Sequence, residues 1–299
     1  MKVAILLLPL FIACSSPKTE STPVVIKEWT QGEERFKQLY PMSAPDSYYI
    51  PNDTNWFEDN PWFMDEKYAF YDYCFGEFGA GVVIRPLRND SLLYEVQNMN
   101  CPVHIQTFKE GYLITGYTGH MRGHSSVLLL DNLTNLNSFT KQDFIDTLIV
   151  LGQGWNTIDT TSQFDYQSFL RWKHKQATWL MDTAGIQLLS AFPRNERELT
   201  VIYSSYYDSI GLFVGQLSLE NDTMNRLLNV QKISNDPAHP RRVQTNTTTI
   251  HGTKAIYTSL ETSNGPGLSY PVELINFGDS VIWRIVDPEL KFIADIEKQ

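Results

Sequence analysis

Positive charge and cysteine are both scarce in this sequence. Across 299 residues, 24 lysines and arginines stand against 34 aspartates and glutamates, which leaves a formal net charge of −10. A protein of this charge repels phosphate groups, so nucleic acid and a bare anionic membrane surface are excluded as electrostatic partners. Only three cysteines are present, Cys14, Cys74 and Cys101.

Long apolar runs and the common catalytic motifs are missing as well. No segment approaches 18 consecutive apolar residues, the length expected of a membrane-spanning helix. There is no G-x-S-x-G nucleophile elbow, no P-loop and no protein-kinase motif set, and the glycines of EFGAG lack dinucleotide-binding spacing. We therefore predict no catalytic residue, no cofactor and no metal, and we lean towards a protein that is not an enzyme.

The first residues carry an export signal. In MKVAILLLPLFIACSS, one lysine precedes a run of ten mostly apolar residues from Val3 to Ile12. This run is about half of the ~20 residues that a spanning helix needs, which is typical of a signal peptide. Its end, Phe11-Ile12-Ala13-Cys14, resembles the lipobox of bacterial lipoproteins, with phenylalanine where leucine is usual.

The lipoprotein resemblance implies that residues 1–13 are removed and that Cys14 becomes a lipidated first residue. Each buried acyl methylene contributes about 0.8 kcal/mol, so two or more chains attach stably to a membrane. In lipoproteins a serine after the cysteine, here Ser15, implies delivery to the outer membrane, and we expect the body to face the periplasm. Residues 14–25 are polar and predict a flexible tether. An ordinary signal peptide that happens to contain a cysteine is the alternative.

Strand-like runs separated by turn-forming clusters dominate the chain from residue 68 onward. In GVVIRPL-RNDS-LLYEV, apolar residues alternate on both sides of such a cluster, the pattern of a β-hairpin. Similar hairpins are predicted over 125–139, 210–230 and 269–286, each preceded by a further strand. A repeat of about 40 to 50 residues is typical of propeller blades.

The sequence therefore predicts an all-β protein with a β-propeller-like domain over 68–299, built from blades of three to four strands. A pair of β-sandwiches is the alternative, because strands at regular spacing suit that architecture too. Residues 26–67 are rich in aromatic and acidic side chains, and we predict that they form an N-terminal clasp on the first blade.

Two cysteines lie within the predicted body. An oxidising compartment permits a disulfide between Cys74 and Cys101. Closing a loop of about 28 residues would stabilise the fold by about 3.5 kcal/mol in the chain-entropy treatment. The sequence leaves open the alternative of two buried thiols that pack as small apolar side chains.

Aromatic rings and carboxylates alternate between Tyr48 and Phe78. The candidate ligand-binding residues there are Trp56, Trp62, Asp65, Asp72 and Glu77. Rings beside carboxylates suit a glycan, since ring faces stack on the apolar faces of sugars. Two carboxylates at about 5 to 9.5 Å would instead suit glycoside hydrolysis. The structural alternative is a clasp whose rings pack inward while its acids stay in water.

Two histidines add a second candidate site. His120 and His124 lie four apart among glycines in GYTGHMRGHSS, a spacing that puts both on one face of a strand. No cysteine or H-E-x-x-H companion accompanies them, so we predict loop residues that contact a ligand and not a metal site.

These observations predict a lipid-anchored protein of the bacterial cell envelope. Its body would present a scaffold to a protein or glycan partner without catalysing a reaction. The alternative is a carbohydrate-active enzyme that uses carboxylates of the 53–77 segment.

Overall fold

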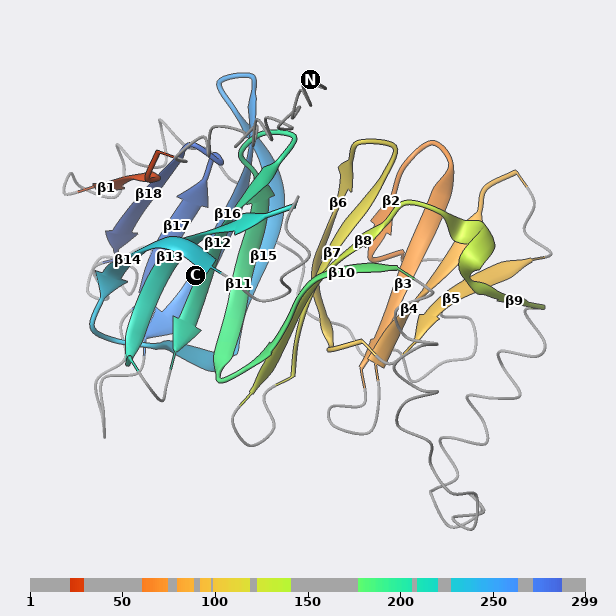
Figure 1. Cartoon of the computed structure of the whole chain (residues 1–299), viewed down its shortest axis with the longest axis horizontal. Coiled ribbons are helices and arrows are strands. Elements are labelled where there is room, and N and C mark those ends of the chain that lie inside the picture. Colours follow the sequence, from red (N-terminus) through yellow and green to blue (C-terminus); the bar gives the residue numbers. More distant parts are fainter. Residues whose placement is uncertain are drawn as a thin grey trace, which may run out of the picture.

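The computed structural model describes residues 22–29, 61–74, 80–88, 92–97, 99–118, 123–140, 177–205, 209–219, 227–262 and 271–286. Within these ranges the chain forms four sheets of four or five strands, and the predicted all-β class is confirmed (Figure 1). All strand pairs are antiparallel except one, and the described helical structure is one short 3₁₀ turn, η2 (Leu133–Asn135). No helix in the described ranges has the length and apolarity to cross a membrane.

The first two sheets are built from residues 63–184. The first sheet has the order β2-β3-β4-β5-β9, with β2 Phe63–Met64, β3 Tyr68–Cys74, β4 Ala80–Pro86, β5 Leu93–Gln97 and β9 Asn137–Phe139. The second sheet has the order β10-β8-β7-β6, with β10 Thr178–Ala184, β8 His124–Leu130, β7 Gly111–Thr118 and β6 Pro102–Phe108.

The other two sheets are built from the remaining strands. The third sheet has the order β11-β12-β13-β14, with β11 Ile186–Pro193, β12 Glu198–Ser205, β13 Gly211–Ser218 and β14 Leu227–Ser234. The fourth sheet has the order β1-β18-β17-β16-β15, with β1 Val25–Glu28, β18 Ser280–Ile285, β17 Pro271–Asn276, β16 Thr253–Thr262 and β15 Ala238–Ile250. Strand β1 is the exception to antiparallel pairing, because it runs parallel to β18.

Three of the four predicted hairpins are confirmed, as β4–β5, β13–β14 and β17–β18. The hairpin predicted over 125–139 is wrong. After β8, Asn132 accepts a hydrogen bond from the backbone N–H of Thr134 and starts η2, which turns the chain away. Strand β9 consequently pairs with β5 of the first sheet, and β8 pairs with the distant β10.

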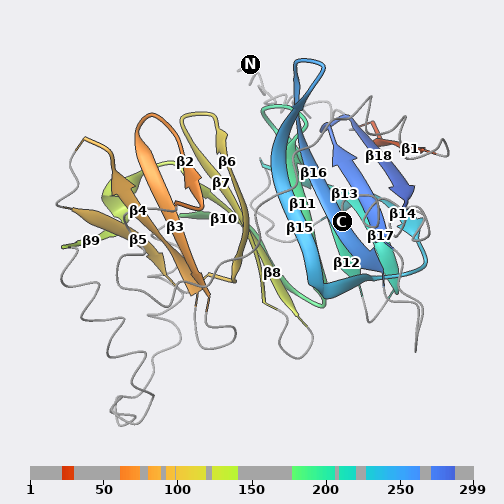
Figure 2. The ribbon, with the colours of Figure 1, turned by 180° about the vertical axis from the view of Figure 1, so that it is seen from behind.

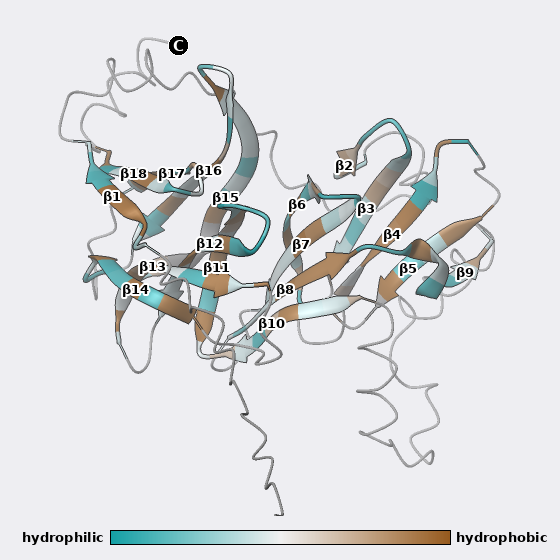
Figure 3. Ribbon diagram, turned by 45° about the horizontal axis from the view of Figure 1, so that its top comes forward, coloured by the Kyte–Doolittle hydropathy of each residue, from teal (hydrophilic) through white to brown (hydrophobic). Residues whose placement is uncertain are grey.

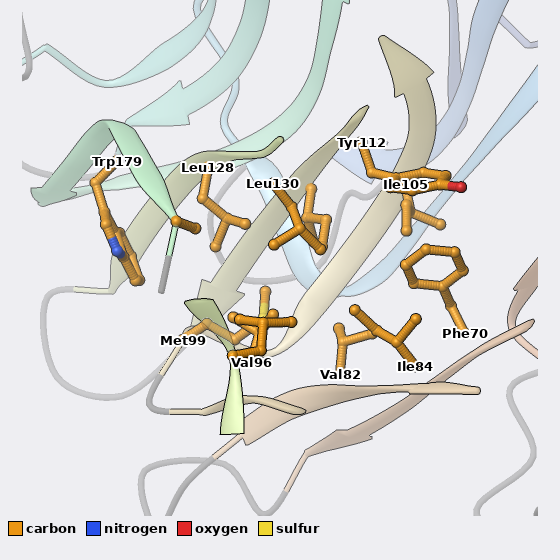
Figure 4. Packing of buried hydrophobic residues seen from close by; sticks show 13 residues of the cluster. Phe70, Val82, Ile84, Val96, Met99, Ile105, Tyr112, Leu128, Leu130 and Trp179 are labelled. Carbon is orange, nitrogen blue, oxygen red and sulfur yellow. The ribbon is translucent and has the colours of Figure 1, made fainter. Parts of the chain in front are cut away.

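Each sheet packs face to face on the next. One core cluster joins the first and second sheets, a second joins the second and third, and a third joins the third and fourth. In the first of these clusters, Phe70 and Ile84 face Leu128 and Leu130 across the interface (Figure 4). Because both faces of the middle sheets are covered, β7 and β12 are buried along nearly their whole length, as expected of strands without a solvent face.

Hydropathy follows this arrangement. Hydrophobic segments lie along the middle of the strands, and the connecting turns are mostly hydrophilic (Figure 3). The strands β6, β11 and β15, one from each of three successive sheets, contact one another near the middle of the molecule (Figure 2).

The directions of the strands distinguish two ends of the stack of four sheets. The hydroxyl of Ser125, at the start of β8, donates to the carbonyl of Ile186 at the start of β11, at 2.8 Å. The Gln106 side chain, near the end of β6, donates to the carbonyl of Ala191 at 2.7 Å. Strands β6, β8 and β11 therefore run the same way.

We define the upper end, as drawn in Figure 1, by the turns at 65–67, 109–110, 131–135, 194–197 and 277–279. The lower end carries Cys74, Cys101, Gly123 and Gly185. Its strand ends meet through the 3.1 Å backbone hydrogen bond from Gly185 to Gly123.

Candidate functional site

Asp65 lies in the tight turn between β2 and β3, at the upper end. Its Oδ1 accepts hydrogen bonds from the backbone N–H groups of Lys67 at 2.7 Å and Tyr68 at 2.8 Å, the local bonding by which aspartate favours turns. Its Oδ2 accepts a hydrogen bond from the hydroxyl of Tyr112 at 2.6 Å. Since Tyr112 belongs to β7, this carboxylate ties the first sheet to the second.

The two groups of this bond keep fixed protonation states. Partial burial raises the pKa of Asp65, but the bonds from Tyr112, Lys67 and Tyr68 and the charge of Lys67 outweigh it, so the pKa lies below its ordinary value. Burial raises the pKa of Tyr112, and the neighbouring Asp65 carboxylate raises it further. At neutral pH Asp65 is therefore an ionised acceptor and Tyr112 a protonated donor.

Aromatic rings surround the Asp65 turn. Tyr112 packs on Phe70 with ring centroids 4.5 Å apart, and on Tyr68 and Phe63 with centroids 6.1 and 6.2 Å apart in edge-to-face geometry. Such pairs stabilise by about 0.5 to 1.5 kcal/mol beyond the area that they bury. Trp62, Phe63 and Tyr68 are only half-buried and pack on the first core cluster. Trp62, Phe63 and Tyr68 therefore pack on buried rings while part of their own surface stays accessible.

A pocket of about 230 Å³ opens beside these rings. It is formed by the β2–β3 turn, the β6–β7 turn and the segment that follows β8. The lining residues are Lys67, Tyr68, Glu110, Gly111, Tyr112, Leu130, Asp131, Asn132, Leu133 and Thr134. Drug-sized ligands occupy pockets of about 300 to 1,000 Å³, so this one suits a small unit such as a single sugar ring.

The sequence-predicted residue Asp65 lies at this upper end, and Trp62 precedes β2 and packs on the first core cluster without lining the pocket. Asp72 does not join them, because it lies on β3 four residues beyond Tyr68, about 13 Å along the strand. Its cross-strand neighbour is Val82, which belongs to the core between the first and second sheets. Burial raises the pKa of Asp72 above its ordinary value. Cys14, Trp56, Glu77 and His120 lie outside the described residues.

The other predicted site residue, His124, lies at the lower end. Its Nδ1 is 3.3 Å from Oδ1 of Asp182 and 3.2 Å from Nδ2 of Asn100, and its side chain is 43% exposed. It is thus not part of the upper pocket. In the described part of the chain, no three His, Cys, Asp or Glu side chains gather in a way that could hold a metal ion.

The lower end also holds a disulfide. Cys74, the last residue of β3, is bonded to Cys101, which precedes β6, with Cα atoms 5.1 Å apart. The backbone N–H of Cys101 donates to the hydroxyl of Thr118 at 3.3 Å. The disulfide therefore links the first and second sheets at the end opposite to the Asp65–Tyr112 contact.

Sequence reasoning missed a set of polar contacts between the edge strands β6, β11 and β15. His104 on β6 lies 2.8 Å, through Nε2, from the hydroxyl of Thr247 on β15. The hydroxyl of Thr245 donates to the carbonyl of Leu189 on β11 at 2.8 Å. Burial lowers the pKa of His104 to about 4, so this histidine is neutral at physiological pH. The sequence does carry a signal for these contacts, because polar residues occupy alternate positions within the strands, at 104 and 106 on β6 and at 245 and 247 on β15.

The chain was compared with protein-family models, with curated proteins and with solved structures, and none of the three comparisons finds a match.

Proposed function

We propose that this protein is a lipid-anchored binding protein of the bacterial cell envelope, and that it binds a glycan in the pocket at the upper end. The observation that carries the proposal is the half-buried ring of Tyr68, held by Asp65 at the edge of a pocket of about 230 Å³. The lipid anchor rests on the lipobox-like sequence that ends at Cys14, outer-membrane delivery rests on Ser15, and a body that faces the periplasm rests on the absence of an acidic run directly after Cys14.

The lining of the pocket suits a sugar. The half-buried Tyr68 supplies aromatic surface for the apolar face of a ring, and the buried Tyr112 forms part of the pocket wall. Lys67, Glu110 and Asn132 supply donors and acceptors for hydroxyl groups around it. Asp65 contributes by positioning, since its bonds to Tyr68 and Tyr112 fix the segments that carry both rings.

The body that presents this pocket is, in our proposal, a propeller-like array. Its support is the chain order of the four sheets, the packing of each sheet on the next and the mutual contact of β6, β11 and β15 through polar residues. Inner strands that meet in this way are expected at the axis of a propeller. A pair of sandwiches, with the first two sheets in one and the last two in the other, is the alternative architecture.

We propose binding without catalysis. Glycoside hydrolysis needs two carboxylates within about 5 to 9.5 Å. Asp72 lies four residues beyond Tyr68 on β3, about 13 Å along the strand from the turn that holds Asp65, and Asp65 is held by three hydrogen bonds. This separation supports the proposal that the two carboxylates do not act together in hydrolysis.

The test is a titration of the purified full chain with oligosaccharides released from bacterial outer-membrane glycolipids. Tyr68→Ala removes ring surface from the pocket, and we expect it to weaken the Kd about tenfold, equivalent to about 1.4 kcal/mol. Asp182→Asn, at the lower end, is the matched control and should leave the Kd unchanged. The proposal fails when the wild-type chain binds none of these saccharides, or when Tyr68→Ala binds them as tightly as wild type.

A further inference from the structure

The described residues that line the upper pocket carry an excess of negative charge. Glu110 and Asp131 contribute two exposed carboxylates, whereas Lys67 contributes the one cation of this set. None of the ion pairs within the described residues involves Glu110 or Asp131. The two carboxylates are therefore available to a bound molecule.

The strand register brings these two carboxylates to one place. Tyr112 of β7 pairs with Leu130 of β8, so the next residues, 110–111 and 131–132, lie side by side at the upper end. At Gly111 the two backbones approach so closely that a Cβ would lie 2.9 Å from Cα of Asp131. Because like charges on neighbouring segments repel each other, this arrangement favours a bound cation.

The nearby lysines leave this charge uncompensated. Lys67 shares a tight turn with Asp65, and its charge contributes to the lowered pKa of that carboxyl, so Asp65 already balances it. Nζ of Lys109 lies 5.3 Å from the centre of the Phe108 ring. Phe108 belongs to the core between the second and third sheets, whereas Tyr112 belongs to the core between the first and second. Lys109 is therefore directed to the opposite face of the second sheet.

Tyr68 adds an aromatic surface to the same wall. Its half-buried ring lines the pocket together with Glu110 and Asp131, and the face of such a ring attracts an ammonium group. A hard metal ion such as Ca²⁺ instead needs about six to eight oxygen ligands, which an aromatic face does not supply. A ring beside two carboxylates therefore suits an organic ammonium group.

We propose that the ligand of the pocket is an amino sugar, and that its protonated amine contacts the ring of Tyr68 and the carboxylates of Glu110 and Asp131. This inference rests on the proposed function and adds the chemical class of the glycan. Acetylation of the amine removes the positive charge, so an acetylated sugar should bind more weakly. An acidic sugar should also bind more weakly, because the two carboxylates repel it.

The experiment is a titration of the purified full chain with two disaccharides, one of glucosamine and one of N-acetylglucosamine, in slightly acidic buffer of low ionic strength. The amine of the first is protonated under these conditions, and the second is neutral. We expect the wild-type chain to bind the glucosamine disaccharide about tenfold more tightly than the acetylated one.

Two variants with the same change in net charge show whether this preference is local. Asp131→Asn, in the pocket wall, should reduce the preference to about threefold, whereas Asp182→Asn at the lower end should retain the tenfold preference. Glu110→Gln combined with Asp131→Asn should reduce it to less than about twofold. Because both side chains are exposed, the double variant should still fold, and an unchanged Kd for the acetylated disaccharide would show that its pocket is intact.

The outcomes separate the inference from the proposed function. Equal or tighter binding of the acetylated disaccharide by wild type overturns the inference, as does a double variant that retains the tenfold preference. Binding of released oligosaccharides without binding of the glucosamine disaccharide overturns it too, and leaves the proposed function in place. Failure to bind any saccharide overturns the proposed function itself.

Discussion

The two ends of the sheet stack are held together by different chemistry. At the upper end, Asp65 bonds to Tyr112 between the first two sheets, and Arg194 bonds to Thr22 and Asp279 between the last two. At the lower end, the covalent bond between Cys74 and Cys101 joins the first two sheets. Between the first two sheets, the upper contact is polar and reversible, whereas the lower one depends on the redox state of its surroundings.

This difference separates stability from binding. A disulfide acts mainly on the unfolded chain and leaves the distant pocket unchanged. The polar contacts of the upper end lie in or next to the pocket and residues 22–29, so their loss changes the positions of the aromatic rings and turns of this end. We expect the lower end to govern whether the body stays folded and the upper end to govern what it binds.

The largest expected effect comes from breaking the lower end. Cys74→Ser combined with Cys101→Ser removes the cross-link, and we expect the free energy of unfolding to fall by about 3.5 kcal/mol because the unfolded chain regains loop entropy. Denaturant unfolding of the oxidised protein and the double variant measures it. Reductant should destabilise wild type and have no effect on the double variant; equal stability of oxidised and reduced wild type would contradict the role given to this bond.

Acid should act on the middle of the molecule, between the two ends. The pKa of His104 is lowered to about 4 by burial, whereas an unfolded histidine titrates near 6.5, so the unfolded chain binds the additional proton between these values. Stability should therefore fall as the pH drops from about 6.5 to about 4, by about 3 kcal/mol from this group.

The matched variant isolates this contribution. His104→Gln retains a polar side chain that does not titrate, so its loss of unfolding free energy between neutral pH and pH 4 should be smaller than that of wild type. Parallel pH profiles for the two proteins would show that His104 does not titrate between folded and unfolded states in the expected way.

The smallest of the stability effects should come from the attachment of residues 22–29 to the body through Arg194. Arg194→Met retains the aliphatic part of the side chain but removes the charged hydrogen bonds to Thr22, and we expect a loss of about 2 kcal/mol. Arg197→Met, in the same turn but exposed, should stay within about 0.5 kcal/mol of wild type. Proteolysis next to residue 22 should also accelerate in Arg194→Met alone; equal cleavage of the two variants would mean that Arg194 does not hold residues 22–29 on the body.

The sequence predicted what is local. Turn-forming clusters between alternating apolar residues predicted three hairpins, and the mixture of rings and acids around Trp62 and Asp65 pointed to the segment that borders the pocket. The hairpin over 125–139 was wrong because pairing of β9 with β5 is decided by contacts between distant residues.

The sequence pattern could not predict which residues lie close together in space. Asp65 and Asp72 are close in sequence, yet a strand carries them about 13 Å apart. Asp65 precedes β3 at the upper end, whereas His124 is the first residue of β8 at the lower end. The length of a strand therefore separates these two predicted site residues. The partner of Asp65, Tyr112, is 47 positions away, and the Thr247 partner of His104 is 143 away. Such pairs leave no periodic signal within a segment.

The most direct test of saccharide binding at the upper end is hydrogen exchange of the full chain. It is measured with and without a saturating concentration of an oligosaccharide that binds in the titration. Protection confined to the backbone of residues 65–68, 109–112 and 131–134 is the expected result. Protection centred on Cys101, His124 and Asp182, with the upper turns unchanged, would contradict the account.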